Sequence, residues 1–451
     1  MSRVSLLSDL LSSIGARSWF AGDEAPRSVE VPEIAALCHR LVSSRGEATG
    51  VRMAAEIING VRALDEKGIK RFFHMLAEEF APDPADLAAA ATAYAADPTP
   101  QALGRLQHIA EPPRQELFRR LNLAPGGTAE LVKLRERLLP LCRKDPARLG
   151  PVDTDLKHLF QSWFNRGFLM LRPIDWNTPA SILEKIIHYE AVHAIGNWDE
   201  LRQRLAPADR RCFAFFHPSI PDDPLIFVEV ALTGEIPASI ATVLDPDRPQ
   251  IAAEEADTAV FYSISNCHKG LASVSFGSFL IKQVAEDLKE HFPNLKTFVT
   301  LSPAPGFAAW VEALPTELRD RLEPAEKRAI EVIATPDWQA DPAAVDEIRA
   351  GMLSLAARYF LRAKRADGQP QDPVARFHLG NGAILNRIMH LGDPSRRGLS
   401  QAYGLMVNYL YDLPRVEQRH EAYAAEGEIA ASRAVTNLLP GRSGHTLKDV
   451  A

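Results

Sequence analysis

Small side chains are concentrated between positions 272 and 278, where they suit contact with phosphate. The five smallest are Ala272, Ser273, Ser275, Gly277 and Ser278. A helix pattern follows directly, and a helix N-terminus offers unpaired backbone N–H groups and a positive dipole end to an anion. The segment therefore predicts a pyrophosphate contact. A helix cap made by the same residues is the alternative interpretation.

Two other positions carry groups that suit chemistry, Ser302 and His378. Ser302 lies in LSPAPGF (301–307), a turn fixed by prolines and a glycine, and we expect its hydroxyl to be exposed there. It either meets a ligand or caps the following helix. His378 lies in ARFHLGNG (375–382), and histidine exchanges protons readily near neutral pH. As one of thirteen histidines, it is alternatively a packed or surface residue.

Five further polar side chains are weaker candidates. His217 and Ser219, in HPSIPDDP, are either turn residues or substrate contacts. His268, just before the small-residue segment, either touches a ligand or is solvated. Arg396 and Arg397 have the guanidinium geometry that pairs with phosphate, and surface solvation is the alternative.

The small-residue segment lies inside a predicted strand–loop–helix–strand unit. The runs 259–265 and 295–301 are rich in β-branched and aromatic residues, as strands are. Between them Phe276, Leu280 and Val284 recur at four-residue intervals, the period of an amphipathic helix. Such a crossover joins parallel strands and places the loop at the carboxyl end of the first strand.

Two earlier strands, at 211–217 and 225–232, extend this unit into a mixed sheet, antiparallel first and then parallel. That order resembles the GNAT acyltransferase fold, in which acyl-CoA lies against the strand–loop–helix element. The helix-start loop of that fold usually reads Arg/Gln-x-x-Gly-x-Gly. Of that pattern, residues 272–277 keep only Gly277, and serine does not freely adopt the positive φ that glycine allows.

The chain before about residue 147 reads as helices, with apolar residues three or four positions apart and prolines between the segments. We predict an all-α helical bundle over 1–152 that supplies a core and an oligomer contact, and an α/β (α+β) GNAT-like catalytic domain with a mixed sheet over 153–451. The boundary is expected in RLGPVDT (148–154). The predicted helices lie at 34–44, 50–64, 69–80, 83–97, 99–110, 113–123 and 129–144.

Composition narrows the functional class. A net charge of −7 argues against nucleic acid as the partner. No apolar run reaches the roughly 20 residues that span a bilayer. The cysteines lack paired metal spacing, so we expect reduced thiols, no disulfide framework and a cytoplasmic location. The four cysteines are Cys38, Cys142, Cys212 and Cys267.

Neither end of the sequence predicts a targeting signal. The opening MSRVSLLSDLLSSIGARSWF is interrupted by Asp9 and is interpreted as a first amphipathic helix rather than a transit peptide. The closing residues 448–451, KDVA, carry no peroxisomal address.

Several short words along the chain resemble the malonyl-CoA decarboxylase family, in family order from position 215 almost to the end. The N-terminal part resembles the family mainly by being helical. The words are FFHPSIPDDPLIFVEVALTGEIP (215–237), FYSIS (261–265), GSFLIK (277–282), LSPAPGF (301–307), PVARFHLGNGAIL (373–385) and RRGLSQAYGLMVNYLY (396–411), with weaker likeness at 163–186 and 190–201.

The resemblance implies a reaction and roles for the residues above. Malonyl-CoA would lose carbon dioxide to give acetyl-CoA without a metal or organic cofactor, because the thioester itself accepts the electron pair. Ser302 and His378 match the catalytic serine and histidine of the family, with the histidine protonating the enolate. A homo-oligomer, either a dimer or a tetramer, is also implied. Asn381 and Tyr411 are also expected to orient the histidine by hydrogen bonds. The expected substrate contacts are Ala272, Ser273, Val274, Ser275, Phe276, Gly277, Ser278, Asn381 and Tyr411.

Two other functions remain open from the sequence. A GNAT-like fold normally transfers an acyl group from CoA to an amine, and fold does not fix function. A non-catalytic acyl-CoA-binding assembly protein would bind the thioester without turnover.

Overall fold

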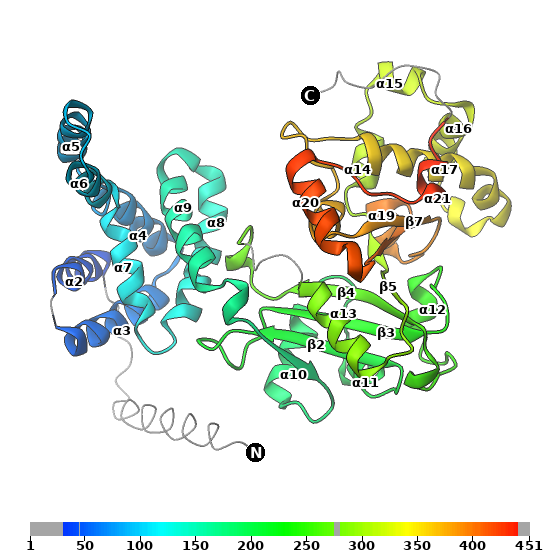
Figure 1. The fold of residues 1–451 in the computed structure, drawn as a ribbon, viewed down its shortest axis with the longest axis horizontal. Helices are drawn as coiled ribbons and strands as arrows, with labels where there is room; N and C mark the ends of the chain where they lie inside the picture. The colour runs from blue at the N-terminus through cyan, green and yellow to red at the C-terminus, as the bar shows by residue number, and fades with distance from the viewer. Residues whose placement is uncertain (1–29, 45, 275–279, 441–451) are drawn as a thin grey trace. The chain divides into compact units, whose positions relative to one another are not determined.

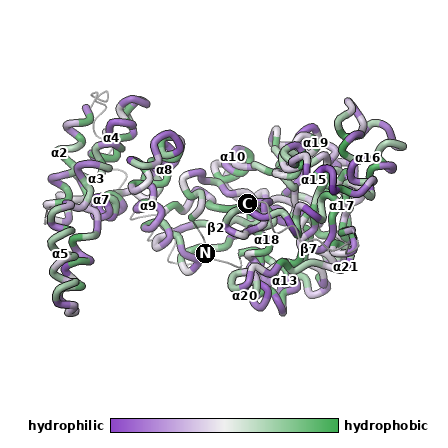
Figure 2. Tube along the Cα trace, turned by 90° about the horizontal axis from the view of Figure 1, so that it is seen from above, coloured by the Kyte–Doolittle hydropathy of each residue, from purple (hydrophilic) through white to green (hydrophobic). Residues whose placement is uncertain are grey.

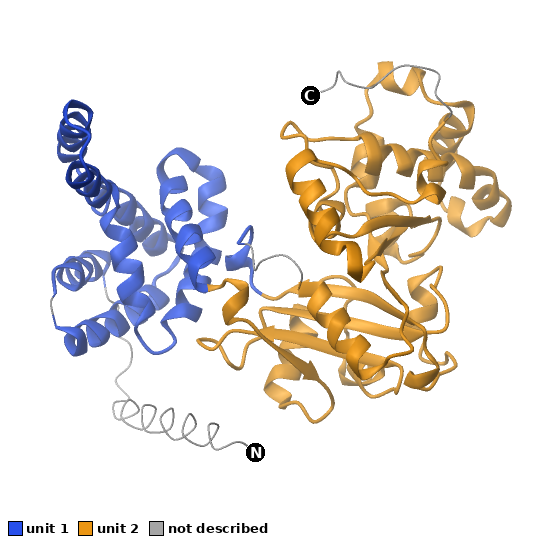
Figure 3. Ribbon diagram, in the orientation of Figure 1, with its two compact units in different colours: residues 1–163, 268–274 blue, residues 164–267, 275–451 orange. Residues whose placement is uncertain are grey.

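The chain forms two compact units in a computed structural model that describes residues 30–440 except 45 and 275–279 (Figure 1). The first unit contains the described parts of residues 1–163 together with 268–274. The second contains the described parts of 164–267 and 275–451 (Figure 3). The predicted fold class is confirmed, because a helical unit is followed by a mixed-sheet unit.

Seven helices of the first unit, α2 to α8, lie at the positions that the apolar spacing predicted, and α9 was not predicted by that spacing. Along most helices hydrophilic and hydrophobic positions alternate (Figure 2), and no described helix has the length and apolar character needed to cross a membrane. The helices are α2 (Val31–Ser43), α3 (Glu47–Ala63), α4 (Glu66–Glu78), α5 (Pro84–Ala96), α6 (Pro100–Ala110), α7 (Pro113–Asn122), α8 (Gly127–Lys144) and α9 (Pro146–Trp163), with the 3₁₀ turn η3 (Lys269–Leu271).

Local sequence explains where these helices begin. Asp83 accepts hydrogen bonds from the N–H groups of Ala85 and Asp86 at the start of α5, and Thr99 accepts one from Ala102 at the start of α6. Proline is the first residue of α5, α6 and α7, where its missing N–H costs nothing.

The core of the first unit combines aromatic packing with a buried ion pair. Phe72 and Phe73 of α4, Phe118 of α7 and Phe160 of α9 are fully buried. In the same region Arg114 Nε lies 2.5 Å from Asp155 Oδ2, which joins α7 to α9. A buried charge is tolerated only when it is paired in this way.

The domain boundary expected at residues 152/153 falls inside a continuous helix. Helix α9 runs through Pro151, and the first unit ends at Trp163. Proline inside a helix removes one hydrogen bond and costs about 3 kcal/mol. Here Leu149, Val152 and Leu156 bury an apolar stripe on either side of Pro151, and this tertiary packing outweighs the local cost.

Segment 268–274 is separate in sequence from the rest of the first unit and is held by α8. The guanidinium of Arg135, itself buried, donates to the carbonyl oxygens of Gly270 at 2.7 Å and Ala272 at 2.9 Å. Its Nε donates to Asp153 at 2.7 Å. A Cβ on Gly270 would lie 1.9 Å from the carbonyl oxygen of Val132, so only glycine allows this close approach.

The second unit is organised around a sheet with strand order β1-β2-β3-β4-β5-β8-β6, and β7 also pairs with β8. Strands β1 to β4 pair antiparallel, β4 and β5 pair parallel, and β8 runs antiparallel to β5, β6 and β7. The strands are β1 (Met170–Ile174), β2 (Arg210–Phe216), β3 (Ile226–Thr233), β4 (Thr258–Asn266), β5 (Thr297–Thr300), β6 (Ser302–Pro303), β7 (Ile384–Met389) and β8 (Met406–Leu410).

Helices and 3₁₀ turns complete the second unit. The predicted helix within the strand–loop–helix–strand unit is present as α13, and Phe276, expected in its first turn, lies outside the described residues. The elements are η1 (Arg166–Phe168), α10 (Ala180–Tyr189), α11 (Trp198–Leu205), α12 (Ile240–Leu244), η2 (Ala253–Glu255), α13 (Leu280–His291), α14 (Phe307–Glu312), α15 (Thr316–Asp320), α16 (Pro324–Ile333), η4 (Trp338–Ala340), α17 (Pro342–Arg362), α18 (Pro373–Gly380), α19 (Arg396–Ala402), η5 (Leu413–Arg415), α20 (Val416–Glu426) and α21 (Arg433–Thr436).

The predicted order of the sheet, antiparallel first and then parallel, is confirmed. The pairing of β4 with β5 runs from Thr258 opposite Thr297 to Phe261 opposite Thr300, whereas β4 continues to Asn266 alongside β3. Strand β8 pairs with the other edge of β5 at Val299, and beyond Thr300 the chain continues to pair with β8 through β6. The carboxyl end of β5 is therefore the place where the parallel pair ends.

Arg135→Met is expected to destabilise the first unit by about 3 kcal/mol, because it leaves two carbonyl groups and Asp153 without their buried partner. The free energy of unfolding, measured by urea titration, tests this. Arg143→Met, which alters an exposed arginine of the same helix, is the matched control. Equal unfolding midpoints for the two variants would contradict the role given to Arg135.

Candidate active site

Three buried polar side chains form a hydrogen-bonded line that begins at Ser302, just beyond the carboxyl end of β5. Ser302 Oγ lies 3.1 Å from His378 Nε2, and His378 Nδ1 lies 2.9 Å from the hydroxyl of Tyr411. All three side chains are at least 95% buried, with exposures of 5%, 3% and 1%. The structure therefore brings together the serine, the histidine and one of the expected contact residues.

Different elements position each member of this line. Ser302 begins β6 and pairs with Val407 of β8. His378 lies in α18, whose first turn is capped by Asp372 through a 2.8 Å hydrogen bond from the N–H of Ala375. Tyr411 follows β8, and its N–H donates to the carbonyl oxygen of Phe298 in β5.

Burial keeps the imidazole neutral. Desolvation lowers the pKa of His378 to about 3 and raises the pKa of Tyr411 well above its usual value. The ring of Tyr409 stacks on the imidazole, with centroids 4.5 Å apart and planes 24° from parallel. The site thus holds one neutral imidazole between two hydroxyl groups, an arrangement able to pass a proton without creating a buried cation.

Two expectations for Ser302 are wrong. The hydroxyl was expected to be exposed, and it is buried because β8 and α18 cover the end of β5. It also does not cap the following helix, since α14 starts at Phe307 and its N-cap is Gly306. The bonds of the Ser302 side chain go to His378 and to Thr300.

Asn381, named as a substrate contact, lies at the end of α18. Its side-chain amide donates to the carbonyl oxygen of Phe377 at 2.7 Å. Both ring nitrogens of His378 are already engaged by Ser302 and Tyr411, so the ring is oriented by those two residues. A contact of Asn381 with substrate stays a prediction.

The predicted phosphate segment is described only in part. Ala272 and Ser273 are exposed, and Val274 is buried. Ser273 adopts φ of 61°, so the left-handed conformation that we did not expect of a serine does occur here. The predicted contacts Ser275, Phe276, Gly277 and Ser278 lie outside the described residues, and phosphate contact stays a prediction.

The weaker candidates have local contacts of their own. His217 Nδ1 accepts a hydrogen bond from the N–H of Ser219 at 3.1 Å, as turn residues do. His268 precedes η3 in the segment held by α8. Arg397 donates to the carbonyl oxygens of Ala191 and Val192, and Arg396 is exposed.

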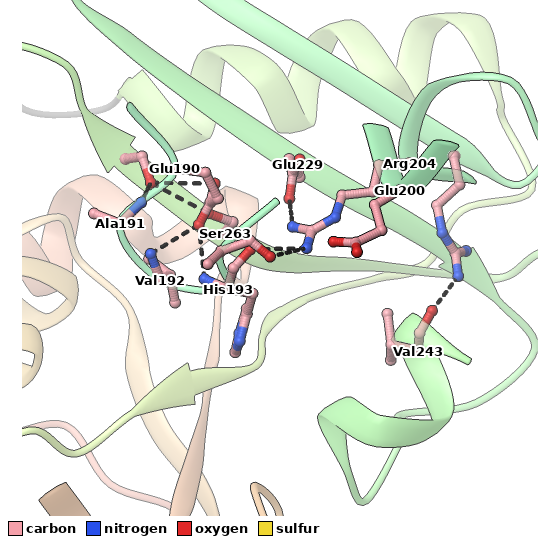
Figure 4. A network of polar contacts seen from close by, with 12 residues as sticks. Glu190, Ala191, Val192, His193, Glu200, Arg204, Glu229, Val243 and Ser263 are labelled. Atoms are coloured by element: carbon pink, nitrogen blue, oxygen red, sulfur yellow. Dashed lines mark hydrogen bonds and ion pairs between the residues drawn. The ribbon is translucent and has the colours of Figure 1, made fainter. Parts of the chain in front are cut away.

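A second buried polar cluster was not predicted from the sequence (Figure 4). The Glu190 carboxylate accepts hydrogen bonds from the hydroxyl of Ser263 at 2.7 Å and from that of Ser265 at 3.3 Å. It also accepts from the N–H groups of Val192 and His193, both at 2.8 Å. Because protein groups satisfy this carboxylate, its clearest role is to hold the connection after α10.

An ion pair completes this Glu190 cluster. Arg204 donates to Glu229 at 2.9 Å and to the carbonyl oxygen of His193 at 2.7 Å. Complete burial raises the pKa of Glu229 to about 7, and Arg204 opposes that shift. The sequence signal was present, since Ser263 and Ser265 alternate on one face of an otherwise apolar strand.

The described residues contain no group of three or more His, Cys, Asp or Glu side chains arranged to hold a metal ion.

Comparison with known proteins identifies the family. Residues 80–164 match the malonyl-CoA decarboxylase N-terminal domain, and residues 167–448 match the malonyl-CoA decarboxylase C-terminal domain. The chain belongs to the malonyl-CoA decarboxylase family. It is therefore an enzyme of the carboxy-lyase class.

Solved structures and a curated relative agree with this assignment. A malonyl-CoA decarboxylase from Rhodopseudomonas palustris is 54% identical with a TM-score of 0.86, covering 91% of this chain and all of that one. One from Agrobacterium vitis is 55% identical with a TM-score of 0.85, covering 90% of this chain and all of that one. The mitochondrial malonyl-CoA decarboxylase of Rattus norvegicus is 34% identical over 338 residues, which are 70% of this chain and 68% of the rat protein.

His378 is expected to make stability depend on pH. Its pKa is about 3 when folded and 6.5 in a model peptide, so between these values only the unfolded chain binds the proton. Stability is therefore complete above about pH 6.5 and is lost as pH falls, at up to about 1.4 kcal/mol per unit. Between about pH 7 and about pH 5 the wild type should lose about 2 kcal/mol more than His378→Asn in urea unfolding. Parallel losses would show that the imidazole titrates normally.

Proposed function

We propose that the chain converts malonyl-CoA to acetyl-CoA and carbon dioxide, with Ser302 and His378 at the reacting end of the substrate. The observation that carries this proposal is the buried hydrogen bond between Ser302 Oγ and His378 Nε2 in a member of a decarboxylase family. Their positions beyond β5 also agree with the rule that ligands bind at the carboxyl ends of parallel strands.

The reaction needs little beyond the thioester itself. When the bond between the α-carbon and the carboxylate breaks, carbon dioxide leaves and the electron pair stays on the α-carbon, shared with the thioester oxygen as an enolate. Hydrogen-bond donors aimed at that oxygen lower the barrier. No metal or organic cofactor is required in this scheme.

Ser302 and His378 have different tasks in this scheme. The Ser302 hydroxyl contacts the carboxylate end of the malonyl group. His378 donates its Nε2 proton to the α-carbon, which forms the new C–H bond of acetyl-CoA. Burial of both groups excludes water that would compete for these hydrogen bonds.

The remaining contacts belong to the CoA part of the substrate. The backbone N–H groups of 274–278 hold its phosphates or the thioester oxygen, and Ala272 and Ser273 let it approach. Asn381 adds a polar contact, and Tyr411 orients the imidazole.

Assembly and location complete the proposal. The chain forms a homo-oligomer through the helical unit, where α5 and α6 together bury only Ala90 among their own side chains and so leave apolar surface for a second copy. It works in the cytoplasm, in line with four cysteines that are all free thiols.

The first test is turnover by the purified protein with EDTA present and no amine acceptor. Malonyl-CoA should yield acetyl-CoA and carbon dioxide in equal amounts, followed by mass spectrometry. Release of free CoA only when an amine is added would instead indicate acyl transfer. Binding of malonyl-CoA without any product would indicate a non-catalytic acyl-CoA-binding protein.

Variants at the two central residues should lose rate rather than affinity. His378→Asn removes the proton donor and is expected to abolish turnover, while Ser302→Ala should lower kcat on the order of 10²-fold. Binding of acetyl-CoA, measured by calorimetry, should stay near that of the wild type. Matched controls are His108→Asn and Ser43→Ala, which alter exposed residues of the helical unit. Wild-type kcat in His378→Asn would exclude that histidine as the donor.

A further inference from the structure

Thr300, the last residue of β5, lies directly behind Ser302 and is fully buried. Residues two apart on an extended chain point to the same side, so the two hydroxyl groups face each other. Ser302 donates its hydroxyl proton to Thr300 Oγ1 across 2.8 Å. The site described above therefore has a fourth polar member, which sequence reasoning did not name.

Two residues of β8 hold Thr300, one by a hydrogen bond to its side chain and one by a hydrogen bond to its backbone carbonyl. The backbone N–H of Tyr409 donates to Thr300 Oγ1 at 3.1 Å. The side-chain amide of Asn408 donates to the carbonyl oxygen of Thr300 at 2.7 Å. A backbone N–H can only donate, so it permanently occupies one acceptor position of the threonine oxygen, and the other acceptor position receives the proton of Ser302.

The direction of these bonds decides which nitrogen of His378 carries the proton. Ser302 has a single hydroxyl proton, and in the ligand-free protein it donates this proton in the hydrogen bond to Thr300. Ser302 Oγ is then an acceptor toward His378, so Nε2 must carry hydrogen. The imidazole is neutral, so Nδ1 has a lone pair and accepts the proton of Tyr411.

We propose that Thr300 is a positioning residue that selects the Nε2–H form of His378, by accepting the Ser302 proton at its own hydroxyl oxygen. The hydrogen bonds then run in one direction, from Tyr411 to His378 to Ser302 to Thr300. This inference rests on the proposed function for its catalytic meaning. Its structural meaning rests on the hydrogen bonds among Thr300, Ser302, His378 and Tyr411 and on the neutral imidazole.

The selected form is the one that decarboxylation needs. After carbon dioxide leaves, the electron pair on the α-carbon must receive a proton, and Nε2–H supplies it while Nδ1 takes the proton of Tyr411. The proton on Nδ1 then goes back to Tyr411 and solvent supplies one proton to Nε2, so the Nε2–H form is restored and charge and atoms balance over the cycle. The opposite form of the imidazole would present a lone pair at Nε2, which accepts a proton instead of giving one.

Thr300→Val tests the proposal, because valine keeps the shape and removes the acceptor. The Ser302 proton should then turn to Nε2, and the imidazole should change to its Nδ1–H form. The measurement is ¹⁵N NMR of histidine-labelled, ligand-free protein, with the His378 signals identified by their absence in His378→Asn. Thr300→Ser restores the acceptor and should keep the Nε2–H form.

Kinetics give the second readout. Thr300→Val should lower kcat about 10- to 100-fold with KM changed by about twofold or less, while Thr300→Ser should stay within about threefold of the wild type. Valine leaves the N–H of Tyr409 without its acceptor, so some loss of stability is expected for Thr300→Val and is not itself evidence. A purely structural role for Thr300 would lower stability without changing the form of the imidazole.

Three results would overturn the proposal: an Nδ1–H imidazole in the wild type, an unchanged Nε2–H form in Thr300→Val, or wild-type kcat in that variant. If Thr300→Val does not fold, the wild-type spectrum still tests the proposal, because it shows whether His378 is in the Nε2–H form. The NMR readout needs no substrate, so it remains informative if malonyl-CoA is not turned over. In that case the proposed function fails while the role of Thr300 is judged separately.

Discussion

The pairing of β8 with the end of β5 is the constraint on which the active site depends. Strand β5 pairs with β4 on one edge and with β8 on the other, and beyond Thr300 the chain continues to pair with β8 through β6. Strand β8 lies about a hundred residues later in the sequence. That one strand supplies the hydrogen bonds to Thr300, carries the ring of Tyr409 that stacks on His378, and leads directly into Tyr411. Without β8 neither the serine nor the histidine would be held.

The two buried polar clusters of the second unit offset the free-energy cost of burying polar groups in different ways. The Glu190 cluster encloses charge, and each charge meets an opposite charge or several donors, so its energy depends on complete pairing. The Ser302 site encloses only neutral groups in its resting form. Neutral groups are less costly to bury and can still exchange protons, which suits a reaction that creates charge only briefly.

The sequence pattern predicted the helices and strands that depend on residues close together in the chain. The strand run at 259–265 became β4 and the N-terminal helices appeared where apolar spacing placed them, because each of these depends on side chains close in sequence. The wrong prediction for Ser302 and the missed role of Thr300 have one physical origin. Both residues are covered by β8, which is far away in the sequence, so the residues near them in sequence do not reveal their burial. Tertiary packing likewise carried α9 through Pro151. Ser302 and His378 themselves were found through family resemblance, since nothing local distinguished them.

The chain passes between its two units three times, at 163/164, 267/268 and 274/275. A gene cut after residue 163 would therefore not produce two complete pieces. The piece after residue 163 would contain segment 268–274 without Arg135, which binds the carbonyl groups of that segment. The piece before residue 164 would lack segment 268–274, which belongs to its own compact unit. The helical unit therefore cannot be separated from the sheet unit by a single cut in the chain. An insertion or deletion of one whole unit during evolution would also alter the other unit.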